Sequence, residues 1–345
     1  MIKRDRLNYC PQNKMIGTKW IASLSLLLIL PLITGKIILP RQVLAQTNSR
    51  SIISTETNIL YVDSARGSDG GEGSQQSPLK TITQALKLAQ PDTIIELSPG
   101  TYSEETGENF PLIIDKSITL QGSPSSQGHN VIITGNGYFV SPTGAGQQVA
   151  IAAIKQAKEI TGVSVINPHT RGHGLWIESA NPQVTNNTFI RNGNTGLSVN
   201  GQSNPIIQNN YFSRNAGNGL LIYGTSKPQV ENNEFNNTGF GVSIVQNAAP
   251  TLIGNSFSGN RIGVILEGNS QAVLRDNVIT DSLEYGLVAI AQSRVNLGTS
   301  DRPGNNVFRG NQKLDIQNAT PYPLNAAGTE INLSLIHISE PTRPS

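Results

Sequence analysis

An internal repeat in the second half of the chain leaves few folds open to it. Aligned on Pro182, Pro205, Pro228, Pro250, Ala272 and Val295, consecutive units are 22 or 23 residues long. The sixth position is Asn in the first five units, and the eighth is Phe in four of them. A fixed period of this length is typical of a solenoid, in which each unit packs only on its neighbours. The two rows are Asn187, Asn210, Asn233, Asn255 and Asn277, and Phe189, Phe212, Phe235, Phe257 and Ile279.

Stacking explains why the rows repeat. Coils of parallel strands lie about 4.8 Å apart, so equivalent residues form ladders along the solenoid. Asn suits a sharp corner because it tolerates left-handed backbone geometry and its amide can bond to the Asn above and below. Phe two positions later is expected to point inward and stack. Asn306 and Phe308 continue both rows after a six-residue insertion at residues 299–304.

A second motif, Gly-apolar-x-apolar, predicts a further sheet that starts at turn glycines. The apolar positions alternate with period two, so they are expected to point inward. No helical pattern lies between the strands, so a coil that returns one layer higher replaces the usual long crossover. The rule for parallel connections favours a right-handed path. We therefore predict an all-β, single-stranded right-handed parallel β-helix over residues 58–325. The glycines are Gly174, Gly196, Gly219, Gly241, Gly263 and Gly286.

The predicted domain begins with a short cap. A strand is expected at residues 59–62, a Gly-rich loop at 63–77, and a helix at 78–89 with Ser77 as its N-cap. One face of this helix is apolar, which suits a plug for the open end of a solenoid. Three short β-rich runs follow, at residues 93–97, 117–120 and 131–134.

The N-terminus has the features of a secretory signal. Basic residues precede an apolar run at residues 20–33, and Val43-Leu44-Ala45 precedes Gln46. We expect cleavage after Ala45, a linker at residues 46–57, and an exported protein in the periplasm, on the outer surface or outside the cell. The alternative is an uncleaved anchor, although the apolar run is shorter than the roughly 18 residues of a typical span.

Removal of this leader changes the charge. Eighteen basic and twenty-two acidic residues remain, a net charge of −4. Because phosphate binding needs a clustered basic face, nucleic acid is not an expected partner. The single cysteine, Cys10, also lies in the leader, so neither a disulfide nor a thiol nucleophile is expected. No cofactor is predicted, and the sequence gives no oligomeric state.

The first coils resemble a known family. The segments Tyr61-Val-Asp-Ser, Gly67-Ser-Asp69, Ser77-Pro-Leu-Lys-Thr-Ile-Thr-Gln-Ala85, Ser98-Pro-Gly-Thr-Tyr102 and Phe110-Pro-Leu112 carry the resemblance. They are similar to cyanobacterial proteins with the DUF1565 domain, within the pectin-lyase-like β-helix superfamily. The resemblance covers residues 58 to about 325 and implies the fold. It implies no particular activity.

The last residues read differently from the rest. Residues 333–343 (LSLIHISEPTR) resemble the translation of an adapter used in making sequencing libraries. Residues 333–345 are therefore interpreted as a non-native tail. The alternative is a natural C-terminal cap.

Three groups of residues were weighed as catalytic or metal sites. Arg171-Gly-His-Gly-Leu175 resembles the Gly-His-Gly of polygalacturonases, but the Asp residues that inversion at a sugar centre requires are absent upstream. Glu231 and Glu234 are the nearest carboxylate pair for a lyase, without a convergent acidic face. Asp63, Asp69 and Glu72 fit no calcium motif and are better explained as turn residues. No catalytic residue and no metal site are predicted.

The outward side of the Gly-apolar sheet is the most informative surface. Its columns contain Trp176, Ser198, Leu221, Ser243, Ile265 and Val288, and Glu178, Asn200, Tyr223, Val245, Glu267 and Ile290. Aligned apolar rows on a solvated face mark a contact site. Aromatic rings beside Asn and Glu suit sugar rings and hydroxyls, which makes Trp176, Glu178, Tyr223 and Glu267 the candidate ligand-binding residues. The alternative is that a long loop or further C-terminal residues cover this face.

Three functions remain open at this point. The first is a non-catalytic module that binds polysaccharide or a cell-surface glycan. The second is a polysaccharide lyase or glycoside hydrolase. The third is an adhesin or scaffold that contacts another protein through the apolar columns.

Overall fold

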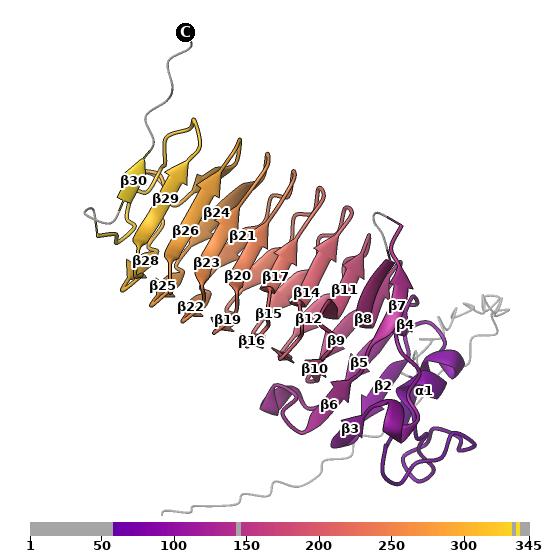
Figure 1. Cartoon of the computed structure of the whole chain (residues 1–345). Helices are drawn as coiled ribbons and strands as arrows, with labels where there is room; N and C mark the ends of the chain where they lie inside the picture. Colours follow the sequence, from indigo (N-terminus) through magenta and orange to yellow (C-terminus); the bar gives the residue numbers. More distant parts are fainter. Residues whose placement is uncertain (1–57, 143–145, 333–335, 339–345) are drawn as a thin grey trace, which may run out of the picture. The chain divides into compact units, whose positions relative to one another are not determined.

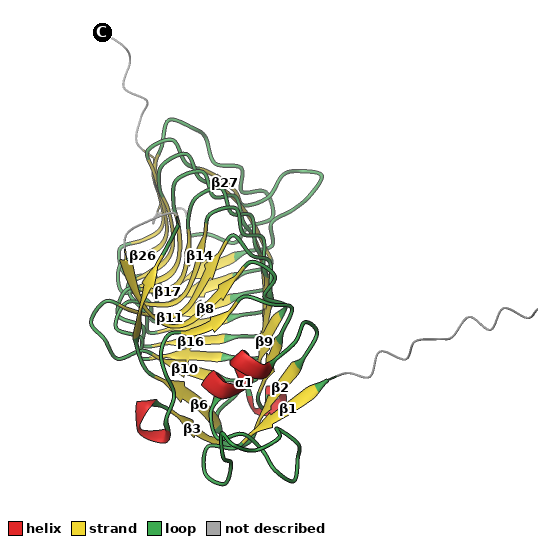
Figure 2. Cartoon of the chain, turned by 90° about the vertical axis from the view of Figure 1, so that its right-hand side faces the viewer, coloured by secondary structure: helices red, strands yellow, loops and turns green. Residues whose placement is uncertain are grey.

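The computed structural model describes residues 58–142, 146–332 and 336–338, all within the unit Thr55–Ser345. These residues form the right-handed parallel β-helix that the repeat predicts (Figure 1). Each regular coil contributes one strand to each of three parallel sheets, named A, B and C. Seen along the solenoid, sheets A and C form opposite walls (Figure 2).

Sheet A contains ten strands, which are β1 (Ile59–Val62), β2 (Ile94–Leu97), β5 (Thr119–Gln121), β9 (Glu159–Thr161), β12 (Gln183–Thr185), β15 (Ile206–Gln208), β18 (Gln229–Glu231), β21 (Thr251–Ile253), β24 (Gln271–Arg275) and β27 (Arg294–Asn296). Sheet B contains nine, which are β3 (Gly100–Tyr102), β6 (Val131–Thr134), β10 (Ser164–Ile166), β13 (Thr188–Ile190), β16 (Tyr211–Ser213), β19 (Glu234–Asn236), β22 (Ser256–Ser258), β25 (Val278–Thr280) and β28 (Val307–Arg309).

Sheet C runs through β4 (Leu112–Ile114), β8 (Gly146–Ile154), β11 (Gly172–Glu178), β14 (Thr195–Asn200), β17 (Asn218–Ile222), β20 (Phe240–Ile244), β23 (Ile262–Leu266), β26 (Tyr285–Ile290), β29 (Leu314–Ala319) and β30 (Ile336–Ile338). Strand β7 (Gly137–Val140) joins this sheet by antiparallel pairing with β8. The two 3₁₀ turns are η1 (Glu104–Thr106) and η2 (Pro124–Ser126). Sheet C carries the candidate site described below.

The predicted inward rows form the core. The rings of Phe189, Phe212, Phe235 and Phe257 stack with centroid separations of 5.0, 4.7 and 4.8 Å. Ile279 and Phe308 continue this row in register. The predicted alternation on sheet C is also confirmed, since pairs such as Leu220 and Ile222 are fully buried in the same core.

The Asn row is a continuous buried ladder. Both the main-chain N–H and the Nδ2 of Asn187 donate to Oδ1 of Asn210, and the pattern continues through Asn233, Asn255, Asn277 and Asn306. The left-handed backbone lies one residue earlier than predicted. Positive φ belongs to Asn186, Asn209, Asn232, Gly254, Asp276 and Asn305.

The structure corrects the role of the repeated glycines. Gly219 and its equivalents lie inside or at the start of sheet C strands and none has a positive φ, so they are not turn residues. A Cβ on Gly219 would lie 2.7 Å from Gly241 O and 2.7 Å from Cδ1 of Phe235. Glycine is required here because the stacked Phe rings and the next coil leave no room for a side chain.

The cap is present but begins later than predicted. The helix α1 (Ile82–Leu88) has Thr81, not Ser77, as its N-cap, and Oγ of Thr81 accepts a hydrogen bond from Gln84 N. Leu79 instead pairs with Val62 as a short extension of sheet A, which keeps Ser77 and Pro78 out of the helix. Ile82 and Ala85 are fully buried in the core, as a plug requires.

Two acidic residues hold the start of this helix. Asp69 accepts hydrogen bonds from the N–H groups of Lys80 and Thr81, and Glu108 accepts from those of Ile82 and Thr83. These N–H groups have no partner within the helix, so the carboxylates satisfy them. Burial raises the pKa of Glu108 although hydrogen bonds from Thr83 oppose it.

Several predictions fall on the chain ends. The expected signal peptide, residues 1–45, and the linker, residues 46–57, lie outside the described residues. Of the expected tail, only the backbone of β30 is described, and it pairs with β29; its non-native origin stays a prediction. Among the described residues, no helix has both the length and the apolar character needed to cross a membrane.

Candidate functional site on the outward face of sheet C

Three outward columns cross sheet C. His173 pairs with Thr195, and Leu175 with Leu197, while the intervening Gly174 has no partner in this register. This irregularity adds the position of His173 to the outward face. The outward positions are therefore those equivalent to 173, 176 and 178, whereas the sequence predicts only the last two. Trp176, Ser198, Leu221, Ser243, Ile265 and Val288 do lie in one column.

The hairpin of β7 and β8 covers part of this face. Val149 and Ala152 pack with Trp176 in a cluster separate from the core, and Ile113 and Phe139 complete it. Trp176 is consequently only 6% exposed. At this end of sheet C the outward face therefore packs against side chains of β7 and of the adjacent strand β8.

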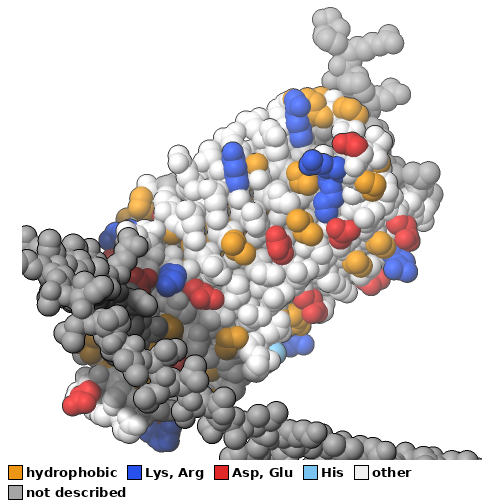
Figure 3. Space-filling model, turned by 180° about the vertical axis from the view of Figure 1, so that it is seen from behind, with side chains coloured by type: hydrophobic (Ala, Val, Ile, Leu, Met, Phe, Trp, Pro, Cys, Tyr) orange, Lys and Arg blue, Asp and Glu red, His pale blue; other side chains and the backbone are white. Residues whose placement is uncertain are grey.

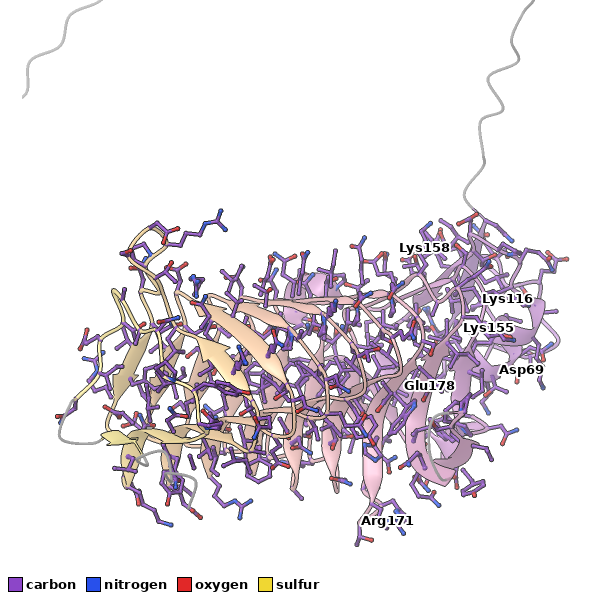
Figure 4. All side chains as sticks on the ribbon, turned by 90° about the horizontal axis from the view of Figure 1, so that it is seen from above. Asp69, Lys116, Lys155, Lys158, Arg171 and Glu178 are labelled. Carbon is purple, nitrogen blue, oxygen red and sulfur yellow. The ribbon has the colours of Figure 1, made fainter. Side chains whose placement is uncertain are left out.

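Glu178 lies beneath the same hairpin. Its Oε2 accepts hydrogen bonds from Nε1 of Trp176 and from Oγ of Ser141, both at 2.8 Å. The carboxylate is 3% exposed, so it fixes the indole and the hairpin rather than facing solvent. In Figure 4, Arg171 by contrast projects from its loop away from the ribbon.

Three adjoining hollows follow the strands beside the hairpin, and together we call them the sheet C groove. The first, about 350 Å³, lies at the start of β11 and shares Gln147, His173 and Asn194 with the second, of about 280 Å³. The second shares Tyr223 with the third, of about 380 Å³. The remaining lining residues are Tyr138, Gly146, Gln148, His169, Arg171, Ser141, Trp176, Asn200, Leu221, Ser179, Gly201, Gln202, Gly224, Thr225 and Gln246.

The groove is almost uncharged. Of its described lining residues, only Arg171 has a permanent charge, and six have amide side chains. Tyr223 is half-buried, and its hydroxyl is held by Nε2 of Gln246. No carboxylate lines the described part of the groove.

His173 is the buried titratable group of the groove. Its ring meets that of Trp176 edge-on at 5.1 Å, and its Nδ1 has no hydrogen-bond partner among the described residues. Burial lowers the pKa of His173 to about 4, and the positive charge of Arg171 adds to this effect. The imidazole is therefore neutral at neutral pH.

The four predicted ligand-binding residues are only partly brought together. Tyr223 lines two hollows, Trp176 lines one with a small exposed edge, and Glu178 is engaged beneath the hairpin. Glu267 lies two coils beyond Tyr223 and lines none of the three hollows. The sequence singles out His173 only within the Gly-His-Gly motif, and it does not single out Asn194 or Gln147 as site residues.

The apolar columns do not form an open patch. Ile262, Ile265 and Val288 pack together on sheet C and are each under 10% exposed. Arg261 lies over the Phe240 ring at 4.6 Å and Lys313 over Tyr285 at 5.2 Å. Cations therefore occupy the two aromatic faces beside this cluster.

The other weighed residues have structural positions. Asp63 accepts hydrogen bonds from the N–H groups of Ala65 and Arg66, and Asp69 caps α1. Hydrogen bonds from Arg66 hold the pKa of Asp63 below its usual range, although burial alone would raise it. Glu231 and Glu234 lie in different sheets, β18 of sheet A and β19 of sheet B.

Comparison with known proteins gives a family and a fold. Residues 65–334 match the family described as "Protein of unknown function (DUF1565)". No curated protein matches the chain. Among solved structures, pectate lyase Pel9A is similar with a TM-score of 0.48 and 14% identity, covering 82% of this chain and 78% of that one.

Two further structures show similar overlap. The alginate lyase from Paenibacillus sp. str. FPU-7 gives a TM-score of 0.41 at 12% identity, over 82% of this chain and all of that one. The Family 28 exopolygalacturonase of Yersinia enterocolitica gives 0.39 at 13% identity, over 82% and 77%. Overlaps of this size say nothing about activity or substrate. The family match, however, spans most of the chain, and this protein belongs to the DUF1565 family.

Proposed function

We propose that this protein is exported and binds a polysaccharide or cell-surface glycan in the sheet C groove without cleaving it. The carrying observation is the lining of the groove, in which amide and hydroxyl groups surround the half-buried ring of Tyr223 and one permanent charge lies at one end. Such a surface offers donors and acceptors for sugar hydroxyls and an aromatic face for the C–H groups of a sugar ring.

The distribution of charge supports the same class of ligand. Lysines near the N-terminal end, which Figure 4 labels, are engaged: Lys155 pairs with Asp115 and Lys158 with Asp92, while Lys116 donates to Ala89 O. Figure 3 shows charged side chains scattered among uncharged ones where grey atoms do not cover the surface. A polyanion would find no basic stripe there.

The proposal is tested by measuring the affinity of the protein for a panel of immobilised neutral and acidic polysaccharides. Tyr223→Ala should weaken binding about tenfold, because the variant loses the ring contact that we assign to the sugar. Tyr211→Ala removes a half-buried tyrosine of sheet B and should leave affinity unchanged. Equal affinity of Tyr223→Ala and the unaltered protein would remove the groove from consideration.

The same samples distinguish binding from catalysis. New reducing ends or unsaturated products that disappear in one carboxylate variant would establish a hydrolase or lyase and contradict the non-catalytic part of the proposal. Specific cross-linking to another protein, without glycan binding, would favour an adhesin or scaffold. Cell fractionation with and without residues 1–45 tests export.

A further inference from the structure

A fourth hollow lies on the opposite wall of the solenoid, at its N-terminal end. It has a volume of about 420 Å³ and shares no residue with the sheet C groove. Strands β1 and β2 of sheet A contribute Tyr61 and Glu96, which are Cα partners on adjacent coils. The remaining lining residues are Asp63, Arg66, Gln75, Pro78, Leu97, Ser98, Pro99, Gly122, Ser123, Pro124 and Asn130.

The side chains in this hollow differ from those of an ordinary solvated face. Tyr61 and Glu96 are both half-buried. The Glu96 carboxylate has no hydrogen-bond partner among the described residues, whereas the buried Asp63 beside it is fully engaged by Arg66 and two main-chain N–H groups. Glu96 is thus a half-buried acceptor on the wall of the hollow that no described residue engages.

Arg66 is held in place but retains free donors. Its Nε and Nη2 both approach Oδ2 of Asp63 at 2.8 Å, which leaves Nη1 without a partner in the described part of the chain. The Arg66 side chain is otherwise 82% exposed, so its remaining N–H groups can be reached from solvent at the edge of the hollow.

The walls of the hollow are tied together without a ligand. The hydroxyl of Tyr102 lies 3.0 Å from Val62 O and 2.8 Å from Ser98 O, and its single proton is shared between these two acceptors. Gly100 N donates to Asn130 O, and Ser123 N donates to Gly162 O. A pocket that is already ordered loses less entropy on binding than one that must form.

We infer that this hollow is a second binding site, for a neutral saccharide unit. The Tyr61 ring offers an apolar face, Glu96 accepts from sugar hydroxyls, and Arg66 and Asn130 donate to sugar oxygens. Asp63, Glu96 and Arg66 sum to one negative charge, which disfavours an acidic sugar. Because sheets A and C face opposite ways (Figure 2), one molecule that also binds glycan in the sheet C groove can bridge two chains. This bridging rests on the proposed function, whereas the second site does not.

Titration with neutral tetrasaccharides of glucose, xylose and mannose tests the inference, with tetragalacturonate as the acidic comparison. Calorimetry should give two bound ligands for the unaltered protein, and in Glu96→Gln or Tyr61→Ala one of the two binding events should be about tenfold weaker. Glu159→Gln changes another half-buried outward carboxylate of sheet A and should keep both. Unchanged thermal unfolding of each variant shows that the fold is retained.

The outcomes separate the two sites. A stoichiometry and affinity that Glu96→Gln and Tyr61→Ala leave unchanged would overturn the second site, and Tyr223→Ala then reports on the groove alone. If the unaltered protein binds one ligand, and Glu96→Gln weakens its binding whereas Tyr223→Ala does not, the result would support the second site and refute the groove. If tetragalacturonate or a free amine binds to the second site more tightly than every neutral sugar, the assignment of a neutral saccharide as the ligand would be overturned.

Discussion

Replacing Asn233 with Ala removes one rung from the middle of the buried Asn ladder. The Asn233 side chain makes four hydrogen bonds: Nδ2 donates to Ile207 O at 2.8 Å and to Asn255 Oδ1 at 3.0 Å, and Oδ1 accepts from N and Nδ2 of Asn210 at 2.9 and 3.0 Å. Asn233 is 2% exposed and Asn210 1% exposed, so water cannot replace these bonds without opening the coil.

The expected cost follows from the groups left without partners. Two N–H groups of Asn210 lose their acceptor, and a buried unsatisfied group costs about 1–3 kcal/mol. We therefore expect a loss of about 4 kcal/mol in the free energy of unfolding. Asn247→Ala, an exposed position with no side-chain hydrogen bond among the described residues, should stay within about 0.5 kcal/mol.

Asn233→Asp separates the acceptor from the donor. Both bonds from Asn210 are retained, but an oxygen replaces the Nδ2 that lies 2.8 Å from Ile207 O, and a charge is buried. The variant should be at least as unstable as Asn233→Ala at neutral pH. It should recover as the pH falls, because protonation restores a donor.

Urea unfolding of the protein without residues 1–45 measures all three variants, with far-ultraviolet circular dichroism and the fluorescence of Trp176 as probes. Agreement between the probes would show that the coils unfold together. A cost below about 1 kcal/mol for Asn233→Ala would refute the claim that the ladder is a main source of stability, since the orphaned Asn210 groups alone should exceed it.

Three further perturbations test the core and the groove. Phe235→Ala should cost about 3–5 kcal/mol in urea unfolding, because Phe235 is stacked between Phe212 and Phe257; a loss below that of a surface change would contradict the stack. Gly219→Ala should cost about 1–3 kcal/mol through its 2.7 Å contacts, whereas Gly70→Ala, with its nearest neighbour at 3.8 Å, should be neutral. The pKa of His173 is lowered to about 4 in the folded protein, so as the pH falls the unfolded chain takes up a proton before the folded one does. The free energy of unfolding should therefore fall by about 3 kcal/mol between pH 6.5 and pH 4. His173→Phe should abolish this component in pH-dependent unfolding and the exposed His169→Gln should not; equal slopes for both would show that His173 is not buried in solution.

A second Asn ladder follows the same repeat and could also have been predicted from it. Asn192 and Asn215 occupy the eleventh position of their units, and Asn192 donates from N and Nδ2 to Oδ1 of Asn215. Thr238 and Asn260 continue it. The fifth position, Asn, Gly or Asp in successive units, likewise carried the signal for the left-handed corner. The second ladder and the left-handed corner are both predictable from the repeat, because equivalent positions stack directly in a solenoid.

The hairpin of β7 and β8 could not be read in the same way. It is antiparallel, it occurs once among the described residues, and it has no equivalent in the other coils. A repeat predicts only what every coil shares, so the contacts of Phe139 with the Trp176 cluster and of Ser141 with Glu178 could not be predicted from it. Of the four predicted ligand-binding residues, Trp176 and Glu178 are consequently covered.

The sequence by itself determined the parallel coil, its period, its inward Phe row and its capping helix, because each of these repeats or obeys a local rule of spacing and capping. The tertiary structure decided which outward side chains remain accessible. That outcome depends on contacts between segments far apart in the chain, such as the hairpin over β11 and the loop at residues 63–78 beside β2, and no periodic pattern encodes them.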